Sequence, residues 1–289
     1  MRHIVAQLLQ ALKHLPVRSS HVPRIMTIAN NKGGTGKTTT AVNLASGLAF
    51  RKGKRVLLVD FDPQGNASIS LDVDIEALKH SVRDLLTGKM LDFKYLVWDK
   101  GENLKILPAN NSLREIENEL VGSVDGRLRL QARLTPVLHE FDFIIIDTPP
   151  TAGVFTQAPL IASTEVIIPV DVGYFSLQGI RQLLEDVEKI RNHYNRSLQI
   201  GGILLTKFDS RTILSKQVEE TLRRSFKEKT FKTVIKVNVD LVRAQINRKS
   251  IFAFDETSSG ARDYQGLIEE VLGNVVQLTP RRAVGAGTA

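Results

Sequence analysis

The sequence predicts an α/β protein with a mostly parallel, twisted sheet that is covered by helices on both faces. Short apolar runs, typical of strands that are buried on both faces, alternate along the chain with longer segments of helical periodicity. The chain has 289 residues, of which 42% are hydrophobic, so it can bury a full core in one large domain or at most two.

The first elements surround a glycine-rich loop. Arg24–Ala29 is expected to be a short strand that ends at this loop, and Thr38–Arg51 to be the helix that follows it. Gly53 is expected to end the helix, because glycine readily takes the left-handed conformation found at helix C-termini. The next strand is Arg55–Asp60, an apolar run that ends in an aspartate. The apolar face of the helix is expected to hold Val42, Leu44, Ala45, Leu48 and Ala49.

The rest of the chain repeats this alternation. Four more strands are expected at the apolar runs LKILPA, FIIIDTPP, EVIIPV and IGGILLTKFD. Helices are expected between most of them, notably at Ser176–His193 and Leu214–Phe226. One domain is expected over residues 24–278, preceded by an N-terminal extension (1–23) and followed by a flexible C-terminal tail (279–289).

Composition excludes several classes of protein and site. The chain contains no cysteine, which excludes disulfides, thiolate metal sites and iron–sulfur clusters. No apolar run approaches the roughly 20 residues of a membrane-spanning helix. The N-terminus has neither the long apolar stretch nor the cleavage site of a signal peptide. These features fit a cytoplasmic protein.

Positive charge is concentrated in one segment of the chain. The net charge is +8, and the segment Arg211–Lys249 holds eleven Lys or Arg and four Asp or Glu, a local balance of 11 − 4 = +7. Taken alone, such a run favours solvated helix faces over a polyanionic partner. Arg24 lies outside the segment and is the control cation that the sequence suggests.

The glycine-rich loop has the context of a phosphate-binding loop. It reads NKGGTGKTTTAVNLA from Asn31 to Ala45, follows a strand and opens a helix. Its glycines let successive backbone N–H groups point inward at an anion, and the helix N-terminus adds positive potential. Lys37 is expected to reach the β- and γ-phosphate oxygens, and the Thr38 hydroxyl to bind Mg²⁺. The first glycine of the ordinary pattern is missing: Asn31 stands there, and an extra lysine, Lys32, follows.

Aspartates follow two of the predicted strands. Asp147 ends the run FIIID in the manner of a Walker B strand, placed to hold Mg²⁺ through a water. Asp60 and Asp62 lie at the carboxyl end of RVLLVD, where open α/β sheets bind their ligands. A turn-forming D-P-Q-G accounts for Pro63 and Gly65, but it does not require two carboxylates beside a phosphate loop.

Four segments together resemble the ParA family of P-loop ATPases, the deviant Walker A or ParA/MinD family: NKGGTGKTTTAVNLA, RVLLVDFDPQGNAS, FIIIDTPP and GGILLTKFDSRT. The resemblance extends from about Arg24 to about Leu272. It implies the P-loop NTPase fold, ATP and Mg²⁺ as cofactors, and slow, partner-stimulated ATP hydrolysis. It also implies a homodimer that forms on ATP binding, non-specific DNA binding in the ATP state, and a ParB-like or cargo-adaptor partner. Such ATPases segregate plasmids or chromosomes, or position other cargo on the nucleoid.

The resemblance also implies roles for individual residues. Lys32 would reach across the dimer to the nucleotide of the other subunit, while Lys37 would contact the nucleotide of its own subunit. Asp62 would position or activate the attacking water, and Asp60 would support Mg²⁺ or the end of its strand. The nucleotide-binding residues would be Lys32, Gly33, Gly34, Thr35, Gly36, Lys37, Thr38 and Thr39.

One region departs from the family pattern. Where the family often has I-P-R-N-V-R-L-x-E-A-P-S, this chain reads IKVNVDLVRAQIN, and Lys236 replaces the proline that lies near the adenine in relatives. Asp240 replaces an arginine that contributes to DNA binding in some relatives, whereas Arg211 matches another. The cations expected to contact DNA are Arg211, Lys236, Arg243, Arg248 and Lys249.

Other classes of protein remain as alternatives. MinD-like relatives bind a membrane through a C-terminal amphipathic helix, but this chain ends in VVQLTPRRAVGAGTA, which argues against a membrane partner. The N-terminal segment RHIVAQLLQALKHL has helical spacing and could dock on the domain, which we favour, or lie on a membrane surface. Too few residues precede the first strand for a helix-turn-helix domain. Small-molecule enzymes with related loops, such as dethiobiotin synthetase, are a third alternative.

Overall fold

The computed structural model describes residues 23–88, 92–173 and 176–273. The predictions for the N-terminal extension, its amphipathic segment and the C-terminal tail fall outside these residues, apart from residue 23. The strands are β1 (Arg24–Ile28), β2 (Val56–Asp60), β3 (Trp98–Asp99), β4 (Leu104–Leu107), β5 (Phe143–Asp147), β6 (Glu165–Asp171), β7 (Gln199–Phe208) and β8 (Thr230–Lys236).

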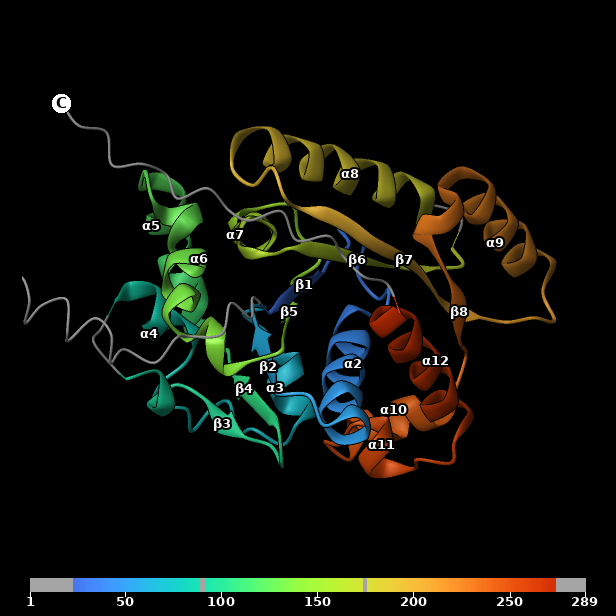
Figure 1. Ribbon diagram of the computed structural model, residues 1–289, viewed down its shortest axis with the longest axis horizontal. Helices are drawn as coiled ribbons and strands as arrows, with labels where there is room; N and C mark the ends of the chain where they lie inside the picture. Colours follow the sequence, from blue (N-terminus) through green and yellow to red (C-terminus); the bar gives the residue numbers. More distant parts are fainter. Residues whose placement is uncertain (1–22, 89–91, 174–175, 274–289) are drawn as a thin grey trace, which may run out of the picture.

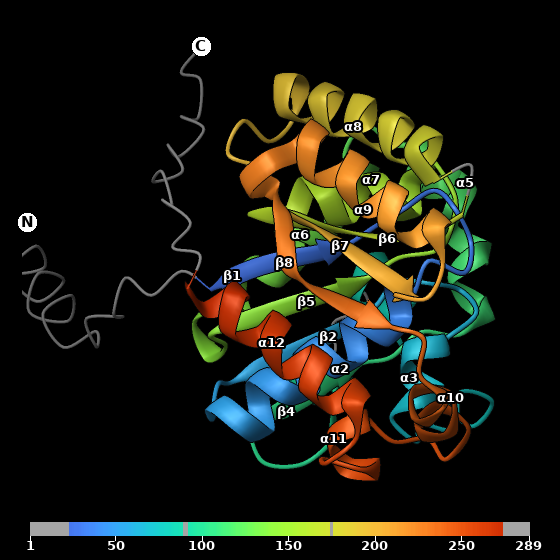
Figure 2. The same ribbon diagram turned by 90° about the vertical axis from the view of Figure 1, so that its right-hand side faces the viewer.

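These strands form one eight-stranded sheet in the order β3-β4-β2-β5-β1-β6-β7-β8 (Figure 1). Every neighbouring pair is parallel except β3 with β4, which is antiparallel. The predicted α/β class and the mostly parallel sheet are therefore confirmed. The carboxyl ends of β1 and β5 point to the same side of the molecule, and α3, α5 and α10 lie on that side (Figure 2).

The helices supply the two outer layers. They are α2 (Lys37–Lys52), α3 (Asn66–Ser70), α4 (Val82–Thr87), α5 (Glu117–Gly122), α6 (Arg129–Leu134), α7 (Val154–Ala162), α8 (Ser176–His193), α9 (Ile213–Phe226), α10 (Val239–Ile246), α11 (Ile251–Phe254) and α12 (Ser259–Gly273). Short 3₁₀ helices η1 (Phe93–Tyr95), η2 (Asn111–Ile116), η3 (Gly126–Leu128), η4 (Thr135–Glu140) and η5 (Lys227–Lys229) join some of them.

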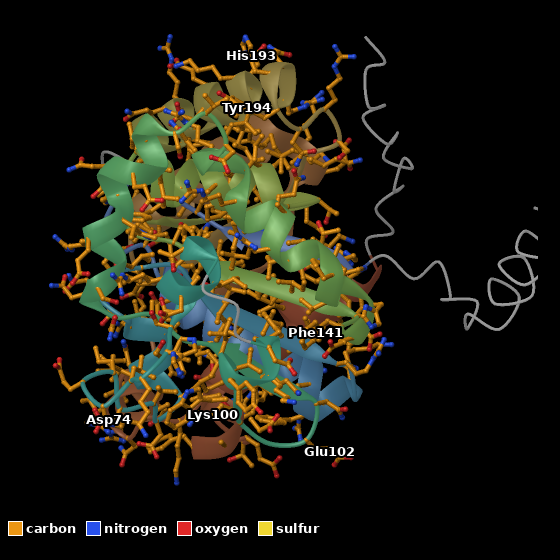
Figure 3. The ribbon with its side chains drawn as sticks, turned by 90° about the vertical axis from the view of Figure 1, so that its left-hand side faces the viewer. Asp74, Lys100, Glu102, Phe141, His193 and Tyr194 are labelled. Atoms are coloured by element: carbon orange, nitrogen blue, oxygen red, sulfur yellow. The ribbon has the colours of Figure 1, made fainter. Side chains whose placement is uncertain are left out.

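Both faces of the sheet are buried, because successive residues of the central strands pack into different clusters. In β2, Leu58 packs with α2 and α12, whereas Leu57 and Val59 pack on the other face, where α4, α6 and α7 lie. The layers are visible in Figure 1, with α2 and α12 below the sheet and α8 and α9 above it. The turn between β3 and β4, with Lys100 and Glu102, lies at one end of the molecule. His193, the last residue of α8, and Tyr194 lie at the other end (Figure 3).

The predicted elements are found within one residue of their expected bounds, except that LKILPA and FIIIDTPP run two and three residues past the ends of β4 and β5. Gly53 ends α2 in the left-handed conformation, with φ 61°, and its N–H donates to Ala49 O. The sequence did not identify β3, β8, α10 or α12. None of the helices in the described ranges combines the length and the apolar character needed to cross a lipid bilayer.

Candidate functional site

The loop between β1 and α2 presents free backbone N–H groups at the helix N-terminus. Gly34 and Gly36 have φ of 75° and 82°, a left-handed conformation that glycine takes without steric cost. Gly36 is the N-cap of α2, no side chain caps the helix, and its first turn contains no acid. The first-turn N–H groups and the positive end of the helix dipole are thus open to an anion.

Side chains from the neighbouring strands fix this loop. Thr206 on β7 donates its hydroxyl to Thr35 O at 2.9 Å. Asn30 donates its amide to Pro169 O on β6 at 2.7 Å, and its Oδ1 accepts from the Lys32 N–H at 2.9 Å. The loop is therefore held in shape before any ligand binds, which lowers the entropy lost on binding.

Lys37 points into the loop. Its side chain is buried, and Nζ donates to Lys32 O at 3.0 Å. Burial lowers the pKa of Lys37, while the carboxylates of Asp147 and Asp62 oppose that shift. A phosphate placed at the helix N-terminus would supply the anionic partner that this buried ammonium lacks.

Lys32 points elsewhere. Its Nζ lies 2.9 Å from both carboxylate oxygens of Asp171, the last residue of β6. Lys32 is one-third exposed, and Gly173 lies so close that an added Cβ would be 2.7 Å from Nζ. The two lysines of the loop are thus held in different places, one inside the phosphate site and one at its rim.

Asp60 and Asp147 are paired neighbours at the ends of β2 and β5, and both are fully buried. The Asp60 carboxylate accepts from the Asp62 N–H and from both the N–H and the hydroxyl of Ser68. Burial raises the pKa of Asp60 to about 7, against the effect of the Ser68 hydrogen bonds. Asp60 was expected to support either Mg²⁺ or the end of its strand. These hydrogen bonds favour the second role, because they join the end of β2 to Asp62 and to α3.

Asp147 has the environment expected of a metal-supporting carboxylate. Neither of its oxygens makes a hydrogen bond of ordinary geometry, although both are buried. Its pKa is raised well above the usual range by burial and by the charge of Asp60, and Thr38 and Lys37 oppose this shift. A buried carboxylate that lacks a well-formed hydrogen bond and lies beside the Thr38 hydroxyl fits Mg²⁺.

Further ligands for such an ion would come from the nucleotide and from water. Within the described residues, no group of three or more acidic or histidine side chains could hold a metal alone. Mg²⁺ commonly keeps several waters and binds through one or two carboxylates plus substrate phosphates. Asp147 offers one such carboxylate, next to the Thr38 hydroxyl and the phosphate loop.

Asp62 lies in the loop after β2 and is buried. One carboxylate oxygen accepts from the Gln64 N–H at 2.9 Å, which fixes the side chain. It is close enough to Lys37 and to Asp147 to affect the pKa of both. The structure therefore places Asp62 beside the phosphate loop, as the sequence predicted.

A cavity of about 200 Å³ adjoins the loop and has mostly aliphatic walls. Gly36 and Thr39 line the end at α2, Tyr264 of α12 contributes to the lining, and α10 lines the far end. Lys236 also lines it, but its Nζ and N–H both bond Asp263, at 3.0 and 2.9 Å. The position beside the phosphate loop and the aliphatic walls suit a purine base.

Most cations of the expected DNA surface have acidic neighbours. Four of them form ion pairs: Arg211 with Asp209, Lys236 with Asp263, Arg243 with Asp240, and Arg248 with Asp72. Lys249 forms no ion pair with the described residues. The local balance of +7 thus overstates the free positive charge of the folded segment.

Exposed aliphatic side chains gather on the same side of the sheet as the phosphate loop. Among the described residues, every exposed Val, Leu and Ile lies in a connection that leaves the carboxyl end of β4, β7 or β8. On α10 they share one face, at positions i, i+3 and i+7. They are Val121, Val124, Leu128, Ile213, Leu214, Val237, Val239, Val242 and Ile246.

The sequence prediction missed Asp171. Its signal was the one that identified Asp60 and Asp147, an aspartate at the end of an apolar strand, but the predicted strand EVIIPV stops one residue before it. The contact of Asp171 with Lys32 joins residues 139 apart in the chain, and only the fold shows it.

Known proteins resemble this chain over most of its length. The family described as "AAA domain" matches residues 23–200. The sporulation initiation inhibitor protein Soj of Bacillus subtilis is 43% identical over 87% of this chain and 99% of its own length. The chromosome partitioning protein ParA of Myxococcus xanthus is 37% identical over 91% of this chain and 93% of its own length. The structure of cobyrinic acid a,c-diamide synthase of Mycobacterium smegmatis, solved with ADP and magnesium, has a TM-score of 0.76 and is 30% identical. The match covers 86% of this chain and 94% of that chain.

Proposed function

Because the chain belongs to the ParA family of partition ATPases, which use ATP and Mg²⁺, we propose that it is a positioning ATPase that dimerises on binding ATP. The ATP-bound dimer binds DNA without sequence preference. A ParB-like or cargo-adaptor protein stimulates hydrolysis and thereby releases the dimer from DNA. The cycle segregates a plasmid or chromosome, or positions other cargo on the nucleoid, in the cytoplasm.

The observation that carries this proposal is the separation of the two loop lysines. Lys37 is buried in the phosphate site of its own subunit, whereas Lys32 is held at the rim by Asp171, partly exposed. Lys32 is about one-third exposed and Asp171 less so, so the pair is partly shielded from solvent but its ammonium is within reach of a second subunit. A phosphate oxygen is a strong charged acceptor, so the nucleotide of that subunit can replace Asp171 as the partner of Lys32.

The exposed aliphatic side chains support a dimer interface on the side of the sheet that carries the phosphate loop. They lie in connections at the carboxyl ends of the strands, the edge of the sheet where the phosphate loop and Lys32 also lie. Burying each one removes apolar surface from water, at about 25 cal/mol per Å². A second subunit placed face to face would cover both sets at once, in a two-fold symmetric contact.

ATP hydrolysis is assigned to residues of the phosphate loop and the start of α2, the end of β5 and the loop after β2. Bound Mg²⁺ would neutralise charge that develops on the phosphates, and Thr38 and Asp147 are the residues that would hold it. Asp62, fixed by the Gln64 N–H, orients the attacking water. Lys37 stabilises charge on the phosphates of its own subunit, and Lys32 does so across the dimer.

DNA binding is assigned to Arg211, Lys236, Arg243, Arg248 and Lys249. The ion pairs of Arg211 and Arg243 are made by exposed arginines, and such pairs are weak. DNA phosphates can therefore replace Asp209 and Asp240 as partners. Dimerisation doubles the number of phosphate contacts, so affinity for DNA rises in the ATP state although the surface of each subunit is unchanged.

Cosedimentation with DNA and with anionic liposomes, each with ATP or ADP, tests this function. We expect ATP-dependent binding to DNA of any sequence, and log K should fall linearly with log salt at about −0.9 per phosphate neutralised. Arg211→Glu should weaken DNA binding while ATP hydrolysis without DNA is retained. Capture of the ATP form by liposomes but not by DNA would replace the DNA assignment with a membrane one.

Arg181→Glu on α8 is the matched control. Arg181 is an arginine as exposed as Arg211, at 85% against 87%, and it also has an acidic neighbour, Glu185. It lies outside the Arg211–Lys249 segment. If both variants lose DNA affinity equally, the loss reflects net charge alone, and the assignment to the segment is wrong.

A further inference from the structure

Lys207 occupies an unusual position between the phosphate loop and the purine-sized cavity. It lies at the carboxyl end of β7, next to Thr206, and lines the cavity that Gly36 and Thr39 also line. A Cβ added to Gly34 would lie 3.8 Å from Nζ of Lys207. The ammonium therefore lies next to Gly34 of the phosphate loop, and Lys207 also borders the cavity.

The backbone of Lys207 is bent away from regular strand geometry. In the pairing of β7 with β8, Leu205 faces Val234 and Phe208 faces Lys236, so β7 has one extra residue there. Lys207 has φ 51°, the left-handed region that glycine normally supplies at such a bulge. Bulges occur often beside active sites, where they redirect a side chain.

A structural reason alone does not account for a lysine at this position. The bulge lets Thr206 reach Thr35 O in the phosphate loop, but that bond needs only the backbone path and the Thr206 hydroxyl. Glycine at 207 would follow the same path with less strain. The lysine side chain must therefore be explained by what it contacts.

The ammonium of Lys207 also differs from the other cations around the nucleotide site. Lys32 is paired with Asp171, Lys236 with Asp263, and Lys37 donates to a loop carbonyl. Lys207 is exposed and forms no ion pair with any acid in the described part of the chain. A cation without an acidic partner, beside open backbone N–H groups, favours an anionic ligand.

We propose that Lys207 is a further nucleotide-binding residue, whose ammonium contacts the phosphate chain of bound ATP from the side opposite α2. ATP would then lie between the helix N-terminus and this side chain. The inference rests on ATP binding at the phosphate loop and is independent of DNA binding and of the adaptor protein.

Calorimetric titration of Lys207→Met with ATP, ADP and adenosine tests the contact. Methionine keeps the length and the apolar stem and removes the charge. We expect the Kd for ATP and ADP to rise about tenfold, as for the loss of one charge-assisted bond. The Kd for adenosine should not change. Lys207→Arg should restore most of the affinity, and Lys207→Gly should lose as much as methionine without a fall in Tm.

Two control variants distinguish an error in the role of Lys207 from an error in the nucleotide site itself. Lys189→Met removes an exposed lysine on α8, far from the loop in sequence, and should leave all three affinities unchanged. Lys37→Ala should weaken ATP binding and so locate it at the phosphate loop. ATP affinity of Lys207→Met within twofold of wild type, or an equal loss for adenosine, would overturn the role of Lys207 alone. A wild-type protein that binds no ATP would overturn the nucleotide site itself.

Discussion

Asp147→Asn should make the ligand-free protein more stable and the enzyme inactive. The carboxylate is fully buried, makes no hydrogen bond of ordinary geometry, and lies beside the Asp60 carboxylate on the neighbouring strand. The raised pKa of Asp147 reports the same cost, because burial and the Asp60 charge both disfavour its ionised form. Asparagine has nearly the same shape and removes the charge.

The gain in stability follows from the cost of an unsatisfied buried group. That cost is about 1–3 kcal/mol and is higher for a charged group, so a neutral amide in its place should recover about 1–2 kcal/mol of the free energy of unfolding. For a domain of about 250 residues this raises Tm by about 2–8 °C. Asparagine is also a poorer support for Mg²⁺, so the stabilisation of the wild type by ATP with Mg²⁺ should be much reduced in the variant.

Differential scanning calorimetry with and without ATP and Mg²⁺ measures both effects on one sample, and phosphate release measures turnover. Ser68→Ala is a useful comparison, because it removes a hydrogen bond from Asp60 and should lower the Tm of the ligand-free protein. A fall in the Tm of ligand-free Asp147→Asn would refute the cost assigned to the buried carboxylate, and full stabilisation by ATP with Mg²⁺ would refute the assignment of Asp147 to the metal.

Further substitutions around the phosphate loop have distinct expected outcomes. Lys37→Ala should weaken ATP binding itself, measured by titration; unchanged affinity would exclude its contact with the phosphates. Asp62→Ala should abolish phosphate release while ATP-dependent dimers persist in light scattering; near-normal turnover would remove its assignment to the attacking water. Asp171→Asn frees Lys32 from its ion pair, so dimers should form at about four- to twenty-five-fold lower protein concentration, because a symmetric dimer releases two such pairs, each worth up to about 1 kcal/mol. A higher concentration requirement would show that Asp171 assists the interface.

The phosphate loop and its flanking elements could be predicted because their signals are local. Glycines with positive φ, a lysine–threonine pair and an apolar helix face lie within about 20 consecutive residues. The carboxylates Asp60 and Asp147 could also be predicted, because parallel strands bring their carboxyl ends to one edge of the sheet.

The elements near the sheet edges could not be predicted from the apolar pattern. β8 is an edge strand, so it carries polar residues such as Lys232 and Thr233 among its apolar ones. β3 has only two residues, Trp98 and Asp99, and both are exposed. A buried parallel strand gives a continuous apolar run, and an edge strand does not.

The electrostatic partners could not be predicted either, because they depend on contacts between distant segments. Arg24 looks like an ordinary surface cation in the sequence, but it bonds Glu165 at 2.8 and 3.0 Å, and Glu165 is almost completely buried. Arg24→Glu would place two carboxylates together in the interior, so it is unsuitable as a control for DNA binding. The acidic neighbours of Arg211 and Arg243 lie within three residues of them, but only the fold shows that they are in contact.

We propose that Lys32 completes the active site of the other subunit, and mixing two inactive variants tests this role most directly. Lys32→Ala and Asp62→Ala are each expected to be inactive alone, since each site in either homodimer lacks one residue. In a mixed dimer, one site has Lys32 from one subunit and Asp62 from the other, so phosphate release should return to a part of the wild-type rate. Complete absence of activity, in heterodimers verified by differential tagging, would contradict the claim and place the action of Lys32 within its own subunit.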